Sequence, residues 1–95
     1  MTNKEVVLAF IAAVADRDLD RIGAVVAPDV RADNAVFHAR SREAFLEDWR
    51  KTFAASTNMR NEIVTVVADG DQVAVFGIVS GDLDGTAYKL DGTPV

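Results

Sequence analysis

The feature that most constrains the fold of this chain is a change of hydrophobic period near residue 58. Before it, apolar residues recur at the three- and four-residue spacing of helices, and after it they follow the two-residue spacing of strands. A chain of 95 residues with one such change has room for one domain. The order predicts an α+β domain in which three N-terminal helices pack on a curved, mainly antiparallel sheet.

The three expected helices each begin at a recognisable residue. Thr2 and Glu5 form a capping box, and Asp18 and Ser41 are typical N-cap residues. Pro28 ends the second helix because the residue before a proline avoids α geometry. The first and third helices carry apolar stripes that predict a buried face, among them Phe10, Val14, Trp49 and Phe53.

The stretch between the second and third helices, residues 30–38, alternates in polarity and predicts one strand. The more apolar parity is expected to face the core and includes Ala32, Asn34, Val36 and His38. Phe37 falls on the opposite parity and is therefore expected to face solvent.

The second half of the chain reads as consecutive antiparallel strands. Met59 to Ala68 is rich in β-branched residues and apolar on both parities, as a covered strand is. Asp69-Gly70-Asp71 predicts a tight hairpin turn, and Gly77 inside the returning strand indicates a bulge or a close backbone approach. Thr86 to Leu90 is expected to form a further strand.

Composition excludes several classes of function. The chain has no cysteine and one histidine, so neither thiolate nor histidine-based metal sites are expected, and no cofactor is indicated. A net charge of −5 argues against nucleic acid or an anionic membrane as partner. No apolar run is long enough to span a bilayer, and the N-terminus is not a signal peptide, so we expect a cytoplasmic protein.

Four short motifs occur in the same order as in a known family. They are Ala27-Pro28-Asp29-Val30, Ser41-Arg42-Glu43-Ala44-Phe45, Asp69-Gly70-Asp71-Gln72-Val73-Ala74-Val75 and Asp91-Gly92-Thr93-Pro94-Val95. Together they resemble the SnoaL-like polyketide cyclase branch of the nuclear transport factor 2-like superfamily. The resemblance covers nearly the whole chain.

This resemblance implies a cone-shaped barrel of the cystatin-like type whose helices and curved sheet enclose an apolar pocket. Family members isomerise, cyclise, hydrolyse epoxides, dehydrate or only bind a ligand, and often dimerise through the outer sheet face, so a homodimer is expected. The family fold continues for at least two strands beyond a turn like Asp91 to Pro94. Residues 1–95 are therefore expected to be a single SnoaL-like domain that is C-terminally incomplete, or one whose sheet edge a partner chain supplies.

The catalytic sets of two branches of the superfamily are not carried over. In ketosteroid isomerase-like members, the resemblance places the general base at Asn34, whose amide does not accept a proton near neutral pH, and the tyrosine at Phe10. In limonene epoxide hydrolase-like members Asn34 matches the asparagine, but Ala32 stands where the tyrosine belongs.

The function predicted from these residues is the binding of a small, mostly apolar molecule in the cone. Any catalysis would be proton transfer or water addition, as in an isomerase, cyclase or hydrolase, by His38 and Asn34; otherwise Asn34 bonds nearby backbone and His38 is merely solvated. The residues expected to line the pocket are Phe10, Val14, Ala32, Val36, Trp49 and Phe53. The alternatives are a non-catalytic ligand-binding or oligomerisation module, whose cavity Phe10, Trp49 and Phe53 fill, and an incomplete copy without activity.

Overall fold

A computed structural model describes residues 1–34, 37–83 and 86–89 of the protein. It contains helices α1 (Asn3–Ala15), α2 (Leu19–Val25) and α3 (Arg42–Ala55) and strands β1 (Ala32–Asp33), β2 (His38–Ala39), β3 (Ser56–Asp69), β4 (Gln72–Leu83) and β5 (Thr86–Lys89). The α+β prediction is confirmed. Within the described ranges, no helix is long and apolar enough to cross a membrane.

Local side-chain contacts begin each helix where the sequence predicts. The Thr2 hydroxyl accepts the Glu5 N–H at 3.1 Å, while the Glu5 carboxylate accepts the Thr2 N–H at 3.2 Å. Asp18 accepts the N–H of residue 21, and Ser41 accepts that of residue 44, each at 3.1 Å. Each cap satisfies an N–H that has no partner within the helix.

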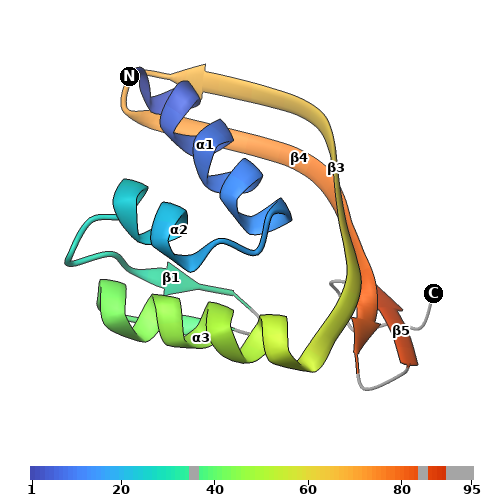
Figure 1. Cartoon of the computed structure of the whole chain (residues 1–95). Coiled ribbons are helices and arrows are strands. Elements are labelled where there is room, and N and C mark those ends of the chain that lie inside the picture. The colour runs from blue at the N-terminus through green and yellow to red at the C-terminus, as the bar shows by residue number, and fades with distance from the viewer. Residues whose placement is uncertain (35–36, 84–85, 90–95) are drawn as a thin grey trace.

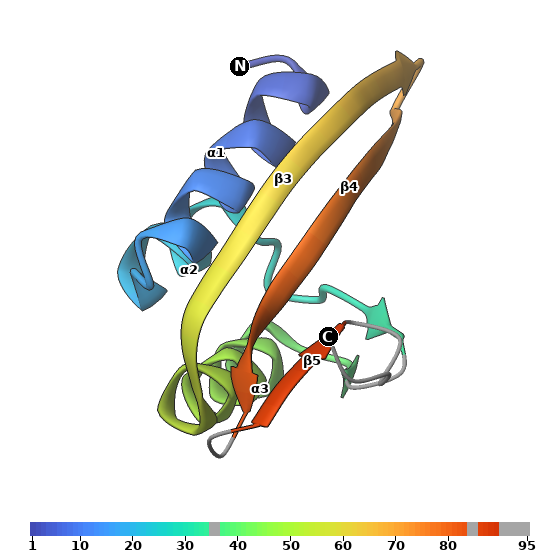
Figure 2. The ribbon, with the colours of Figure 1, turned by 90° about the vertical axis from the view of Figure 1, so that its right-hand side faces the viewer.

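A long, bent hairpin forms the other layer of the fold. The helices lie on one side of β3 and β4, which curve around them in both views (Figures 1 and 2). The sheet order is β3-β4-β5, and all pairs are antiparallel. Gly70 closes the β3–β4 turn with a φ of 60°, as the predicted hairpin requires.

The middle of the hairpin is irregular, and a glycine makes the irregularity possible. Ile63 pairs with Gly77 and Thr65 with Phe76, so Val64 is an extra residue in β3. Such a bulge bends its strand and increases the twist. A Cβ atom on Gly77 would lie 2.6 Å from the carbonyl oxygen of Glu62. The predicted close backbone approach is thus confirmed.

The segment between α2 and α3 differs from the predicted single strand. β1 and β2 are two short strands that pair with each other, Ala32 with Ala39. Asn34 causes the reversal, because its Oδ1 accepts the N–H of Phe37 at 2.7 Å and its own N–H bonds the Phe37 carbonyl at 3.0 Å. After this turn, the side chains that face the core are those of the opposite parity. Phe37 is therefore buried and His38 exposed, so the prediction for both side chains is wrong.

One arginine ties the helical layer to the start of the sheet. Arg17, in the turn between α1 and α2, donates through Nη2 to the carbonyl oxygens of Phe53 and, at 3.1 Å, of Ser56. Its guanidinium carbon also lies 5.0 Å from the centre of the Phe53 ring. These carbonyls lie at the corner where α3 passes directly into β3, so Arg17 caps the end of α3.

Replacing Gly77 tests the close approach that shapes the hairpin. We expect Gly77→Ala to lower the free energy of unfolding by about 1–3 kcal/mol, because the new methyl group must push the backbone of residue 62 away. Gly81→Ala is the matched control, since its Cβ would meet its nearest neighbour, the Met59 Cα, at an ordinary 3.4 Å. Equal losses in urea unfolding would contradict the role assigned to Gly77.

Candidate functional site

A large concave site lies between the helices and the inner face of the hairpin. It is a groove of about 510 Å³, within the range of small-molecule sites. Its walls come from α1, the β1–β2 turn, α3, β3 and β4, through Val7, Phe10, Ile11, Val14, Asn34, Phe37, Phe45, Trp49, Thr52, Met59, Asn61, Glu62, Ile63, Val75, Gly77, Ile78 and Val79. We call it the inner groove.

An aromatic cluster forms the helical wall of the inner groove. The Trp49 ring meets Phe37 edge-on with centroids 4.9 Å apart, and it lies 6.1 Å from Phe10 and 6.2 Å from Phe45. Phe37 and Phe45 are nearly fully buried. Because these rings come from α1, α3 and the β1–β2 turn, they fix the positions of all three segments. The wall therefore offers a preformed apolar surface.

Few polar groups line the inner groove, and Glu62 is the one charged residue among the described lining residues. Asn34 lines it as well, but its carbonyl oxygen already accepts the Phe37 N–H. The Thr52 hydroxyl donates to the Asp48 carbonyl at 2.8 Å. Asn61 is half-buried on β3. The groove is therefore suited to a mainly apolar occupant.

Among the residues predicted to line a pocket, those that the structure describes fall into two groups. Phe10, Val14 and Trp49 line the inner groove, as does Asn34. Ala32 is half-buried against the core and Phe53 lies within it, and neither lines the groove. Val36 falls outside the described residues.

The strand residues of the groove were missed by the sequence analysis. Asn61, Ile63, Val75 and Val79 line it from the sheet. Residues 63–67 are apolar on both parities, so alternation does not show which face is covered. The position of Gly77 was the one available signal, because a missing side chain leaves space at that point.

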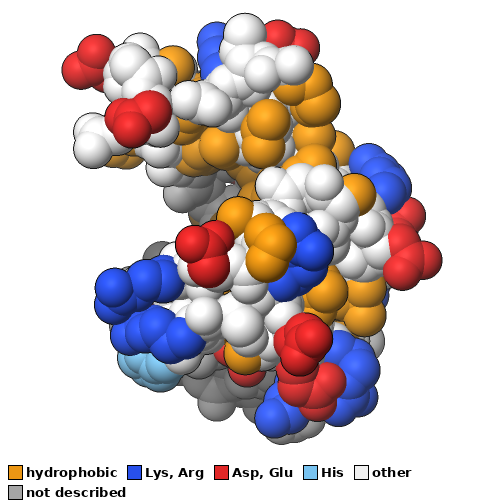
Figure 3. All heavy atoms as spheres, turned by 90° about the vertical axis from the view of Figure 1, so that its left-hand side faces the viewer, with side chains coloured by type: hydrophobic (Ala, Val, Ile, Leu, Met, Phe, Trp, Pro, Cys, Tyr) orange, Lys and Arg blue, Asp and Glu red, His pale blue; other side chains and the backbone are white. Residues whose placement is uncertain are grey.

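His38 lies outside the groove. Its side chain is 72% exposed, and its Nδ1 is 3.9 Å from Asp33 Oδ1, which also accepts a 2.8 Å bond from Arg40. The histidine is visible beside basic side chains on the surface in Figure 3. The expectation that Asn34 and His38 share an inward face is therefore wrong, and His38 has no contact with the groove.

Two arginine–carboxylate pairs on exposed helix surfaces perturb pKa values, and both lie away from the groove. The bidentate hydrogen bond from Arg50 lowers the pKa of Glu47 below its usual range, and that of Arg50 is raised. The hydrogen bond to Asp16 raises the pKa of Arg21. Such exposed pairs contribute little to stability. Among the residues described, no three potential metal ligands lie together.

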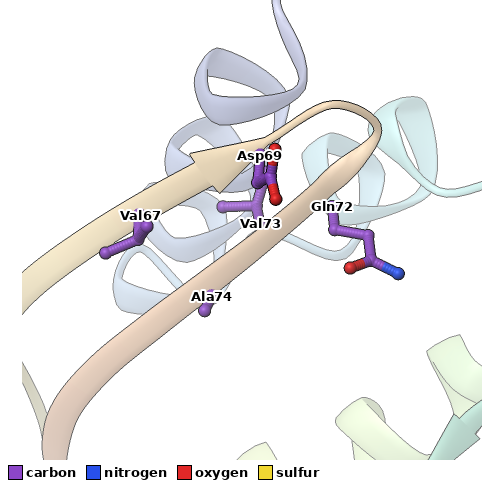
Figure 4. Close-up of a pocket in the computed structure, with 5 residues that line it drawn as sticks. All are labelled: Val67, Asp69, Gln72, Val73 and Ala74. Atoms are coloured by element: carbon purple, nitrogen blue, oxygen red, sulfur yellow. The ribbon is translucent and has the colours of Figure 1, made fainter.

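A second, more open pocket lies at the tip of the hairpin. It measures about 420 Å³ and is lined by Val67, Asp69, Gln72, Val73 and Ala74 (Figure 4). The Asp69 and Gln72 side chains come from different strands and do not converge on a common point. Only the inner groove combines walls from both layers with an aromatic surface, so we regard it as the candidate site.

Comparison with known proteins identifies the family. The model of the SnoaL-like domain matches residues 7–95. The chain belongs to the SnoaL-like family. This family lies within the nuclear transport factor 2-like superfamily, in agreement with the sequence motifs. No curated protein matches the chain significantly.

Solved structures with the same fold come from several bacteria. A protein with a ketosteroid isomerase-like fold from Catenulispora acidiphila, in complex with trimethylamine, is 22% identical, with a TM-score of 0.78 over 94% of this chain and 71% of its own. An LEH-like epoxide hydrolase from M. tuberculosis is 19% identical, with a TM-score of 0.79 over 92% of this chain and 65% of its own. IdmH from Streptomyces antibioticus, a candidate polyketide cyclase, is 21% identical, with a TM-score of 0.74 over 94% of this chain and 77% of its own. At these identities the likeness concerns the fold.

Replacing His38 tests its placement outside the groove. We expect His38→Ala to leave ligand affinity in the inner groove unchanged and to shift Tm by less than about 2 °C, because an exposed side chain supports little packing. Calorimetry measures Tm, and a ligand titration measures the affinity. A large loss of affinity with an unchanged Tm would return His38 to the site.

Proposed function

We propose that this SnoaL-like domain is a cytoplasmic protein that binds a small, mostly apolar molecule in the inner groove. The observation that carries the proposal is the aromatic wall formed by Phe10, Phe37, Phe45 and Trp49 along a groove of about 510 Å³. Burying an apolar ligand against these rings would release water from both surfaces, which is the main driving force for such binding.

The fold relatives support a small-molecule ligand. One was solved with trimethylamine, and others are an epoxide hydrolase and a candidate polyketide cyclase. The resemblance places a general base and a tyrosine at Asn34 and Phe10, and neither side chain transfers protons. The proposal therefore concerns binding, with Asn34 as a polar group at the groove wall.

Adjacent residues on β3 provide a test with a built-in control. Ile63 lines the groove, whereas Val64 does not and is 65% exposed. We expect Ile63→Lys to weaken binding of the neutral dye N-phenyl-1-naphthylamine about tenfold or more, because it brings a charge into an apolar site. Val64→Lys should leave dye affinity unchanged. Fluorescence titration measures both, and equal affinities in the two variants would contradict the proposal.

The outer face of the hairpin supports a second proposal, a homodimer. Directly paired residues of antiparallel strands share a face. Phe76 pairs with Thr65, and Val67 with Ala74. Along β4, residues 74 and 76 alternate with Gly77, the partner of Ile63, so both pairs lie on the face opposite to that of Ile63. Phe76 is 55% and Val67 52% exposed, and neither lines the inner groove. We propose that a second copy of this chain covers this apolar face.

Substitution on this outer face tests the dimer. We expect Phe76→Asp and Val64→Lys each to weaken self-association about tenfold or more, because a charge would be placed in an apolar contact. Ile63→Lys, on the other face, should leave it intact. Sedimentation equilibrium gives the association constant. If the wild-type chain sediments as a monomer both at working concentration and after 100-fold dilution, that result would contradict the proposed dimer.

A further inference from the structure

The β1–β2 pair has one apolar face and one charged face. Ala32 pairs with Ala39, and these two side chains face the core, where Ala39 is buried and Ala32 half-buried. Because successive residues of a strand point to opposite faces, the residues on either side of each alanine share the outward face. Four exposed residues make up this outward face, namely Arg31, Asp33, His38 and Arg40.

Positive charge exceeds negative charge on this outward face. Asp33 is its one carboxylate among the described residues. The Asp33 Oδ1 accepts a 2.8 Å bond from Arg40 Nη1 and lies 3.9 Å from His38 Nδ1. Arg31 forms no ion pair with any residue that the structure describes. Two arginines therefore share one carboxylate here, although the chain as a whole has a net charge of −5.

The register of the two strands brings the arginines together. Arg31 and Arg40 each lie one residue outside the Ala32–Ala39 pair, so extending the register by one residue sets them opposite each other. Side chains in opposite positions have Cβ atoms about 4.5–5.5 Å apart, and like charges placed so are destabilising. An anion between the two guanidinium groups would replace this repulsion by attraction. Each guanidinium presents N–H groups as a fork that matches phosphate oxygens.

We propose that Arg31 and Arg40 bind the phosphate group of a small phosphate monoester on the outward face of β1–β2. A tetrahedral phosphate offers oxygens to both guanidinium groups and carries about 1.5–2 negative charges, whereas a planar carboxylate is satisfied by one arginine fork. The exposed imidazole of His38 adds a further N–H donor beside them. None of the four residues is among the described residues that line the inner groove, so this site is a second one, beyond the proposed function.

The charge around the outward face limits the size of the ligand. Basic side chains gather beside the histidine on a small part of the surface (Figure 3). Exposed carboxylates of Asp29 and Glu43 lie close along the chain to the two arginines. A nucleic acid or an anionic membrane would extend over these carboxylates and meet the negative charge of the whole chain. The face therefore fits a single phosphate group.

A small probe tests this site on the unmodified protein. Methyl phosphate has little apolar surface with which to enter the inner groove, and acetate serves as the carboxylate control. We expect methyl phosphate to bind about fivefold more tightly than acetate at equal ionic strength, because phosphate can engage two arginines. In ¹H–¹⁵N spectra the shifted amides should gather at residues 31–33 and 38–40. Equal affinities, or shifts spread over the whole surface, would overturn the proposal.

Arginine variants separate a built site from general attraction. Arg31→Gln and Arg40→Gln should each weaken methyl phosphate binding about fivefold. Arg50→Gln is the matched control, because Arg50 is likewise exposed and paired with one carboxylate, so the net charge changes equally. It should keep the affinity within about twofold, since exposed pairs away from the site contribute little. An equal loss in all three variants would overturn the site.

The two sites of the chain can be tested independently. Arg31→Gln and Arg40→Gln should leave the affinity for N-phenyl-1-naphthylamine unchanged, because neither arginine lines the inner groove. Both side chains are exposed, so these substitutions put little packing at risk. If methyl phosphate fails to bind while the dye binds normally, the phosphate site is wrong and the binding function of the groove stands.

Discussion

The packing of Trp49 against the surrounding phenylalanine rings is the interaction on which the rest of this structure depends. The cluster joins α1, through Phe10, to α3 and to the β1–β2 turn, through Phe37. Aromatic pairs of this kind contribute about 0.5–1.5 kcal/mol each beyond the area that they bury. The rings fill the space among the helices but leave the side toward the hairpin open. The same packing therefore stabilises the helical layer and forms the wall of the inner groove.

The helices and the hairpin could be predicted because local interactions determine them. The caps at Thr2, Asp18 and Ser41 each join residues three positions apart, which sequence spacing reveals directly. The turn at Gly70 needs a positive φ, for which glycine is the obvious residue. In each case the cause lies within one turn of chain. The α+β arrangement followed from the order of these elements.

The β1–β2 segment was not predictable from alternation because two patterns compete there. The polarity of residues 30–38 suits a single strand, but an asparagine side chain can also bond the backbone of a following residue and reverse the chain. Asn34 does so, and this moves Phe37 into the core. The polarity pattern carries no information about which alternative is more stable. Packing of Phe37 against Trp49 favours the reversal.

The candidate site was accordingly predictable from its helical wall and not from its sheet wall. Phe10, Val14 and Trp49 follow the helical stripe and line the groove. The sheet wall depends on the register between β3 and β4 and on the extra residue Val64, which moves the strand from one parity to the other. Both are long-range features that no local pattern contains. Phe53 illustrates the remaining limit, since a stripe residue can face the core instead of a cavity.

The contact of Arg17 with the α3–β3 corner has a consequence for motion. It links the helical and sheet layers at residues 53–56, so this corner is held more firmly than the rest of the strand. The next irregular point along the strand is the bulge at Val64. Beyond it, the arm of β3 and β4 extends to the turn at Gly70 with helices on one side only (Figure 2). We therefore expect any outward flexing of this arm to centre on the irregular point at Val64 and not on the corner held by Arg17.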